Sequence, residues 1–258
     1  MVGEEPGDPD DPGTAPRDEG TWSDMGGERT AEDVLAARIS AAVRGLAAQD
    51  SLQSTLDSTV TSAVAMVDGC SAAGVTLVER DGEVTTPAAS DGVAGRGDVL
   101  QYELGEGPCL DAVRHAEVVT TDDLADDARW RRWGAAVVDE LGVRSMLCVQ
   151  LFTSDSRHGA LNLYAREPRA FTDESRAVAT TFAAVAAAAL GAARTEERLG
   201  SRVQTRTIVG QAQGVLMERH GIGAQQAIDL LATVAAERGA TVVELAHELL
   251  ADVGARTS

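Results

Sequence analysis

The sequence predicts an α+β domain with a mainly antiparallel sheet and flanking helices, which a long helix joins to an all-α unit of three helices. Three observations support this fold class. Two pairs of apolar segments are separated by short polar turns, which is typical of β-hairpins. Helical spacing precedes and separates these pairs. From residue 173 to the end of the chain the spacing is helical and proline is absent.

Helical spacing marks the first regular structure in the chain. Apolar residues recur every three or four positions from Leu35 to Leu46, and again from Leu52 to Val67. This period places them on one face of a helix. We therefore predict one or two amphipathic helices before the first hairpin.

Apolar segments with turn signals between them predict the sheet. Residues 74–79 and 84–86 flank an Asp81-Gly82 turn, which favours a tight hairpin. A second pair follows later, with a polar connection at 153–158 between its strands at 145–152 and 159–166. Consecutive strands joined in this way pair antiparallel.

The segment between the two hairpins begins with a glycine-rich stretch. A short helix is predicted at 108–115, because Pro108 is well placed in the first turn of a helix. A strand at 118–120 and a helix at 129–141 follow.

A long helix is predicted to begin after Thr172, which we expect to be its N-cap. Asp173 and Glu174 then lie at the positive end of the helix dipole. An apolar seam with spacings of four and three continues along the helix and slips only at Glu196. Its members are Val178, Phe182, Val185, Ala189, Ala192, Leu199 and Val203. Such a seam is typical of coiled coils, so we predict a parallel homodimer through this helix.

Residues 205–258 are predicted to form three helices. The first should end at His220-Gly221 and the second at Gly239, since glycine commonly follows the last turn of a helix. Thr241 and Glu244 have the spacing of a capping box, which opens the third helix.

Charge is distributed unevenly along the chain. The formal net charge is −19, and all 22 basic residues are arginine. This balance excludes a broadly basic nucleic-acid-binding protein, because affinity for phosphate depends on local positive charge. Residues 1–32 carry a net charge of −8 and residues 33–197 one of −11, whereas residues 198–258 have no net charge. Any nucleic-acid site is therefore expected in the last 61 residues.

Composition also bears on the location of the protein. The acidic N-terminus has no apolar core of a secretory signal, and residues 1–32 are predicted to be disordered. The uncharged stretch 177–193 is rich in alanine, and we interpret it as a buried helix rather than a membrane span. Three cysteines are too few for a disulfide framework and fit a reducing cytoplasm. We expect a cytoplasmic protein with no membrane partner.

Two stretches of the sequence resemble known domains. Residues 102–112, with the sequence YELGEGPCLDA, together with the 145–152 strand and the helix start at Phe171, resemble the GAF domains of actinobacterial two-domain regulators. Residues 208–219, with the sequence IVGQAQGVLMER, resemble an ANTAR domain, as do the later segments 226–228 and 243–246. The order of a GAF domain followed by an ANTAR domain is itself specific.

The resemblance implies a function and a domain organisation. It implies a GAF sensor, with an unknown small-molecule ligand in its pocket, that controls an ANTAR output. This output binds paired RNA hairpins in leader transcripts as a homodimer, prevents transcription termination and associates with RNA polymerase. The domains are then a disordered acidic tail (1–32), a GAF-like sensor domain (33–172), its C-terminal helix continuing as a coiled-coil linker (173–204), and an ANTAR-like three-helix domain (205–258).

The resemblance also implies candidate RNA contacts in and beside the first ANTAR helix. These are Arg202, Arg206, Gln211, Ala212, Gln213, Gly214 and Arg219. The family usually has a cation where this chain has Gln213, and often has one where it has Ala232. Each missing cation removes a phosphate contact, so RNA binding is expected to be weak and salt-sensitive. An ANTAR-like end used only for dimerisation or protein interaction is the alternative.

Cys109 leads to a second alternative. It lies at a predicted helix start after Gly105 and Gly107, where a thiol pKa can be lowered. GAF-fold free methionine-(R)-sulfoxide reductases have a cysteine after a similar turn, so a redox sensor or a reductase is possible. Those enzymes need a further cysteine downstream, where this chain has none in 126–130. A buried, unreactive Cys109 is the favoured interpretation.

Other signals for chemistry are weak. The histidines are too scattered for a metal site; they are His115, His158, His220 and His247. Trp130 and Trp133 are more simply packing residues than a lid over a pocket. The acidic group Asp122, Asp123, Asp126 and Asp127 is interpreted as a solvated loop. Because no set of nucleophile, base and orienting group can be assembled, we expect a protein without enzymatic activity, resident cofactor or metal.

Overall fold

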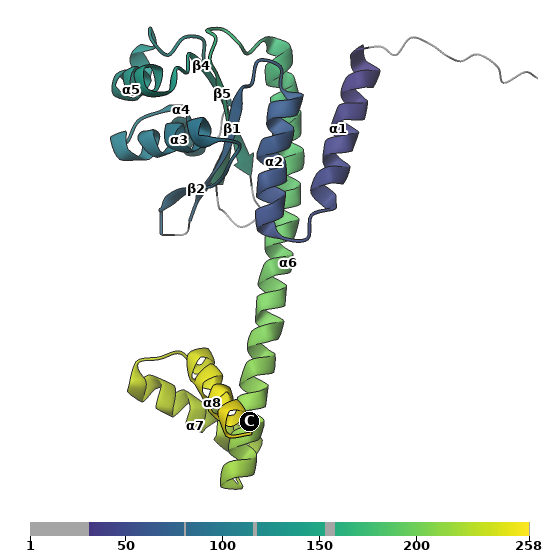
Figure 1. The fold of residues 1–258 in the computed structure, drawn as a ribbon, viewed down its shortest axis with the longest axis vertical. Helices are drawn as coiled ribbons and strands as arrows, with labels where there is room; N and C mark the ends of the chain where they lie inside the picture. The colour runs from purple at the N-terminus through teal and green to yellow at the C-terminus, as the bar shows by residue number, and fades with distance from the viewer. Residues whose placement is uncertain (1–30, 80, 116–117, 153–157, 258) are drawn as a thin grey trace, which may run out of the picture. The chain divides into compact units, whose positions relative to one another are not determined.

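The fold contains a five-stranded sheet with helices on both faces, and a group of helices at the C-terminal end (Figure 1). The computed structural model describes residues 31–79, 81–115, 118–152 and 158–257. Its helices are α1 (Ala31–Ala47), α2 (Leu52–Met66), α3 (Gly92–Leu104), α4 (Pro108–His115), a 3-10 turn (Ala128–Trp130), α5 (Arg131–Leu141), α6 (Asp173–His220), α7 (Ala224–Arg238) and α8 (Val242–Thr257). Its strands are β1 (Ala72–Val78), β2 (Val84–Ala89), β3 (Val118–Thr121), β4 (Ser145–Phe152) and β5 (His158–Ala165).

The sheet has the strand order β2-β1-β5-β4-β3, and each neighbouring pair is antiparallel. Both predicted hairpins are present, and the β1–β2 turn contains Gly82 at a positive φ of 88°. One face of the sheet is covered by α2, over β1 and β2, and by α6, over β4. The helices α3 and α4 lie on the opposite face (Figure 1). The prediction of a mainly antiparallel sheet with flanking helices is confirmed.

The glycine-rich stretch between the hairpins contains a helix that the sequence analysis did not predict. Asp91 caps the N-terminus of α3 by accepting hydrogen bonds from the backbone amides of Val93 and Ala94, each at 3.0 Å. Gly105 ends the helix in the left-handed conformation. Glycine weakens a helix in isolation, but at Gly97 it permits close packing. A Cβ there would lie 3.0 Å from the Tyr164 ring.

The helix α6 begins where the sequence predicted and continues further than expected. Thr172 caps it through Ser175, and the helix then extends over 48 residues to His220. The first of the three predicted C-terminal helices is therefore the last part of α6, with no break at 204/205. Because α2 and β4 pack against it, the N-terminal part of α6 is a core helix of the GAF-like region.

The predicted seam on α6 is not a single exposed stripe. Val178 and Phe182 are buried in the core of the same chain, whereas Leu199 and Val203 are 54% and 65% exposed. The difference arises because the first part of α6 packs on the sheet and the middle part does not. Residues 178 and 182 are thus unavailable for a coiled coil in this conformation.

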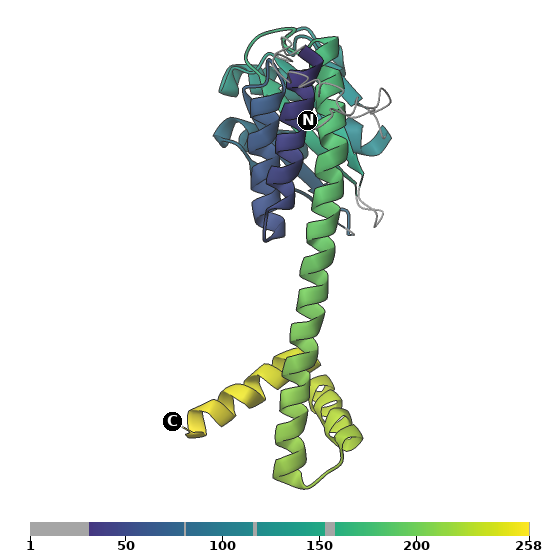
Figure 2. The same cartoon turned by 90° about the vertical axis from the view of Figure 1, so that its right-hand side faces the viewer.

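The C-terminal helices pack against the last turns of α6 (Figure 2). Their shared core consists of Ala212, Leu216, Ala227, Leu231, Ala235, Leu245 and Ala246. Gly221 and Gly239 end α6 and α7 in the left-handed conformation, as predicted. Thr241 and Glu244 form the expected reciprocal capping box at the start of α8.

Two predictions concern segments that the structure describes only in part. The predicted disordered tail lies outside the described residues except for positions 31 and 32, which belong to α1. The connection between β4 and β5 likewise lies outside them, at 153–157. Within the described ranges, α6 is the one helix long and apolar enough to span a membrane by length and composition. Its packing against β4 and α2 is that of a core helix.

Candidate functional sites

The predicted RNA contacts occupy different environments on α6. Arg202, Arg206, Gln211, Gly214 and Arg219 are exposed. Ala212 is fully buried in the core shared with α7 and α8, so a ligand cannot reach it in this conformation.

Gln213, the residue that replaces the usual cation, is half-buried. Its Nε2 donates a hydrogen bond of 2.8 Å to the carbonyl oxygen of Ala224 at the start of α7. The side chain therefore links α6 to α7.

The exposed candidates divide into two groups. Arg202 and Arg206 are four residues apart and so lie on one face of α6. Gln211, Gly214 and Arg219 instead line a groove of about 620 Å³ together with Leu250 and Val253 of α8. The structure does not place all the predicted contacts on one surface.

A second groove of about 920 Å³ follows α6 beside the β3–β4 edge of the sheet. Small residues of α6 line it, among them Ala184, Ala188 and Gly191, and Leu199 lies at one end. On the sheet side, Gln150 is only 6% exposed, and its Oε1 has no hydrogen-bond partner among the described residues. This groove could not be predicted from the sequence, because the sheet forms one of its walls, and β3 and β4 come to lie beside α6 only when the strands pair.

The most developed polar arrangement lies between the sheet and α3, centred on the fully buried carboxyl of Asp98. Asn162 Nδ2 donates to Asp98 Oδ1 at 2.7 Å, and Thr86 Oγ1 donates to Oδ2 at 3.0 Å. The hydroxyl of Tyr164 also donates to Oδ1. These donors come from β5 and β2, so three elements meet at one carboxyl.

A chain of hydroxyl groups connects this carboxyl to Cys109 at the start of α4. Tyr102 Oη lies 2.8 Å from Thr86 Oγ1 and 2.7 Å from Thr76 Oγ1. The Cys109 Sγ lies 3.1 Å from Thr76 Oγ1, which also accepts a hydrogen bond from Asn162 Nδ2 at 2.8 Å. We call these residues the Asp98 cluster; they are Thr76, Thr86, Asp98, Tyr102, Cys109, Asn162 and Tyr164.

Glycines leave room for the cluster. A Cβ at Gly74 would lie 2.5 Å from Asp98 Oδ2, and one at Gly97 would lie 3.0 Å from the Tyr164 ring. Gln101 connects the cluster to the turn before α4. Its Nε2 donates to Tyr164 Oη at 3.2 Å, and its Oε1 accepts from the Cys109 amide at 2.8 Å.

Burial controls the acid–base properties of the cluster. Loss of solvation raises the pKa of Asp98 from 3.8 to about 7, although hydrogen bonds from Tyr164, Thr86 and Asn162 oppose the shift. Burial also raises the pKa of Cys109 to about 12, and the negative charge of Asp98 adds to this. Desolvation outweighs any lowering of the Cys109 thiol pKa by the helix start, which agrees with the favoured interpretation of a buried Cys109. A thiol in this state is a poor nucleophile.

Of this cluster, the sequence pointed to Cys109 but not to Asp98. A signal was present: Asn162 and Tyr164 alternate along β5, which places both on one face of the strand. Asp98, Gln101 and Tyr102 have helical spacing. Without a predicted helix at 92–104, these two sets could not be placed together.

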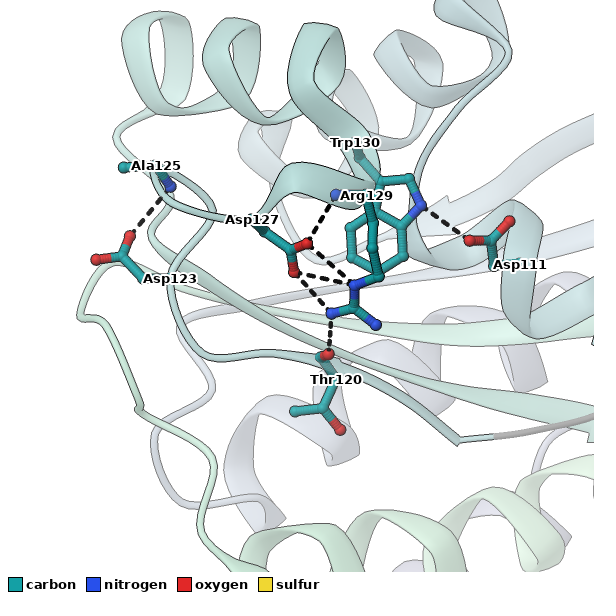
Figure 3. A network of polar contacts seen from close by, with 7 residues as sticks. All are labelled: Asp111, Thr120, Asp123, Ala125, Asp127, Arg129 and Trp130. Carbon is teal, nitrogen blue, oxygen red and sulfur yellow. Dashed lines mark hydrogen bonds and ion pairs between the residues drawn. The ribbon is translucent and has the colours of Figure 1, made fainter.

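The acidic loop 122–127 is more ordered than the sequence suggested. Asp127 accepts three hydrogen bonds from the Arg129 guanidinium, which also donates to the Thr120 carbonyl at 2.7 Å (Figure 3). This pairing lowers the pKa of Asp127 to about 2. Asp123 pairs with Arg144 at 2.5 Å. Part of the predicted solvated loop is therefore fixed by ion pairs.

The two tryptophans pack in the core, as favoured from the sequence. Trp130 is 3% exposed, and its Nε1 donates to Asp111 Oδ2 at 2.9 Å (Figure 3). The Trp130 ring is also covered by the Arg129 guanidinium, 4.1 Å from the ring centre. Trp133 is fully buried and donates to the carbonyl of Gly97 at 3.0 Å. Within the described residues, no three histidine, cysteine or acidic side chains are grouped to hold a metal ion.

Comparisons with known proteins identify both parts of the chain. Residues 49–191 match the family model described as a GAF domain, and residues 197–250 match the one described as an ANTAR domain. The ANTAR match thus begins eight residues before the boundary expected at 205. No curated protein matches the sequence.

Solved structures share the fold of the first part at low sequence identity. One is the GAF domain of a phosphoenolpyruvate-protein phosphotransferase from Coxiella burnetii, with 17% identity, a TM-score of 0.52, and coverage of 66% of this chain and 99% of that chain. Another is a free methionine-R-sulfoxide reductase from Neisseria meningitidis, with 16% identity, a TM-score of 0.50, and coverage of 66% and 97% respectively. The photosensory core module of a Stigmatella aurantiaca phytochrome has 12% identity and a TM-score of 0.55, and covers 81% of this chain and 46% of that chain.

Proposed function

The chain belongs to the GAF–ANTAR family of two-domain regulators, and from this membership we propose that it is a signal-responsive, RNA-binding regulator of transcription antitermination. The observation that carries the proposal is the ANTAR match, which follows the GAF match along the same helix α6. In this proposal the GAF domain receives a signal, and the ANTAR end binds paired hairpins of a leader transcript. Association with RNA polymerase and a cytoplasmic location belong to the same proposal.

The charge distribution supports an RNA site at the C-terminal end. Residues 1–197 carry all of the net negative charge and would repel RNA, whereas residues 198–258 have none. Arg202, Arg206 and Arg219 are exposed in this part of the chain. Gln213 can donate a hydrogen bond but adds no charge, so we expect weak affinity that falls steeply with salt.

A homodimer through α6 would present two RNA-binding ends. Exposed residues on this helix form a line with spacings of four and seven, which keeps them on one face. They are Ala184, Ala188, Ala192, Leu199 and Val203. We call this line the α6 stripe. It borders the groove beside β3 and β4, and its small side chains would allow two helices to approach closely.

Hairpin RNA binding across salt concentrations tests the proposed function. Replacing Arg202 and Arg206 together with alanine should weaken binding and reduce the slope of log K against log salt by about two, or about one per lost phosphate contact. Arg131→Ala is the matched control, because it removes one exposed cation from α5 in the GAF domain. An unchanged affinity and salt slope in the double variant would contradict the assignment of these arginines.

A second candidate function is protein interaction through a degenerate ANTAR end. The hydrogen bond from Gln213 to Ala224 favours it, because this side chain is used within the fold. A wild-type protein that dimerises but binds no hairpin RNA at low salt would favour this candidate. The GAF and ANTAR architecture fits a regulator rather than an enzyme.

A further inference from the structure

Asp98 is a buried carboxyl with no cation beside it among the residues that the structure describes. Its side chain has no exposed surface, and its three hydrogen-bond donors are the neutral groups of Thr86, Asn162 and Tyr164. None of the ion pairs found in the described part of the chain includes it. Buried carboxylates are normally paired with a cation, because an isolated charge is costly to remove from water.

With Asp98 ionised, the direction of every hydrogen bond in the hydroxyl chain is fixed. A carboxylate only accepts, so Thr86 must donate to Asp98 Oδ2. The oxygen of Thr86 is then free to accept from Tyr102, whose own oxygen accepts from Thr76. Thr76 in turn accepts from the Cys109 thiol, which stands at the far end of the chain.

Protonation of Asp98 permits the opposite order. One proton from solvent converts the carboxylate to a carboxyl group, which can donate to the Thr86 oxygen. Thr86 then donates to Tyr102, Tyr102 to Thr76, and Thr76 to the sulfur of Cys109. The two bonds of Tyr102 fit either order, because either oxygen can be the donor in each of them. The bonds from Thr86 to Asp98 and from Cys109 to Thr76 have the direction of the ionised state and would reverse on protonation.

The titratable groups that face Asp98 come from four elements. They are Tyr102 on α3 itself, Cys109 on α4, Cys148 on β4 and Tyr164 on β5. Burial raises the pKa of each of them, with the negative charge of Asp98 contributing, so all four remain neutral near pH 7. Asp98 is therefore the group in this cluster that changes charge near neutrality.

We propose that the Asp98 cluster is a proton-linked switch in the GAF domain, in which uptake of one proton by Asp98 reverses the hydrogen bonds that tie α3 to β1 and β2 and those that tie β1 to α4. The strands β1 and β5, which carry Thr76, Asn162 and Tyr164, lie in the sheet that α2 and α6 cover on its other face. The switch thus acts on the sheet against which α6 packs. Only the output of the switch, a change in RNA binding, rests on the function proposed above.

Infrared spectroscopy of the full chain tests the switch without RNA. A protonated carboxyl has a C=O stretching band that disappears on ionisation, and we expect this loss in the wild type with a midpoint near pH 7. The band should be absent from Asp98→Asn. It should be unchanged in Asp139→Asn, which removes an exposed carboxyl on α5. The proposal is overturned if the wild type and Asp98→Asn give the same spectra from about pH 6 to about pH 9, the range in which exposed carboxyls stay ionised.

Thr86→Val provides a second test that keeps Asp98 and does not depend on the folding of Asp98→Asn. It removes a charge-assisted donor to the ionised carboxylate and a weaker, uncharged acceptor for the protonated carboxyl, so the midpoint should move upward by less than about one pH unit. An unchanged midpoint contradicts the proposed order of hydrogen bonds.

RNA affinity measured on both sides of the midpoint then tests the output. It should change in the wild type and stay constant in Asp98→Asn. A protein whose buried carboxyl titrates near neutrality but that binds no RNA at any pH would support the switch and contradict the proposed function.

Discussion

Single residues determine how the turn before α4 is built. Gly105 and Gly107 have positive φ angles of 69° and 148°, which glycine adopts without strain. Gln101 reaches from α3 to the amide of Cys109, so its side chain fills the space beside Gly107. The turn is therefore linked to the Asp98 cluster through Gln101.

Gly107→Ala should destabilise the GAF domain strongly. The new Cβ would overlap with the Gln101 side chain. The alanine would also have to adopt the positive φ of this position, which residues with a side chain rarely do. Backbone strain of this kind costs about 1–3 kcal/mol, and displacing Gln101 adds the loss of its hydrogen bond to Cys109.

Urea unfolding of the full chain measures the effect. Gly200→Ala is the control: it lies within α6 with open space around it and should stabilise by about 0.5–1 kcal/mol. Equal effects of the two substitutions would contradict this account of the turn.

At the scale of the elements, helix starts could be predicted where a capping residue marks them in the sequence. The start of α6 at Thr172 and the start of α8 at Thr241 follow from side-chain caps, which depend on residues three positions apart. The helix α3 was missed because its glycines weaken the local signal, and its stability comes from contacts with β1 and β2. The Asp98 cluster could not be predicted for the same reason, since its two members on α3 meet its four members on the sheet only when α3 packs there.

Thr241→Ala should destabilise the ANTAR end by about 1 kcal/mol, because it removes the N-cap of α8 and one half of the capping box. Thermal unfolding monitored by circular dichroism would detect this as a lower melting temperature of the C-terminal helices. Thr233→Ala serves as the comparison, because Thr233 is an exposed threonine inside α7 whose side-chain hydroxyl donates to the Asp229 carbonyl of its own helix. The same loss in both variants would exclude capping as the cause.

At the scale of the whole molecule, α6 belongs to both domains. Its N-terminal part packs in the GAF core, and its C-terminal part contributes Ala212 and Leu216 to the ANTAR core. The sequence predicted a linker with a boundary at 204/205, but helical spacing continues through this point and no cap interrupts it. A change at the sheet can therefore be transmitted to the ANTAR end through a continuous helix.

The dimer proposed through the α6 stripe makes a prediction for the intact chain. Leu199 is 54% exposed, so Leu199→Glu should leave each chain folded. In a parallel dimer the substitution would place two glutamates against each other and remove two buried leucines. Each leucine contributes about 1.5–3 kcal/mol when buried, so the dissociation constant should rise at least about 100-fold.

Ser201→Glu is the matched control, because it lies about 200° around the helix from Leu199. Sedimentation at micromolar concentration should show the wild type and Ser201→Glu as dimers and Leu199→Glu as a monomer. A monomeric wild type, or a Leu199→Glu variant that remains dimeric, would show that the α6 stripe is not the interface.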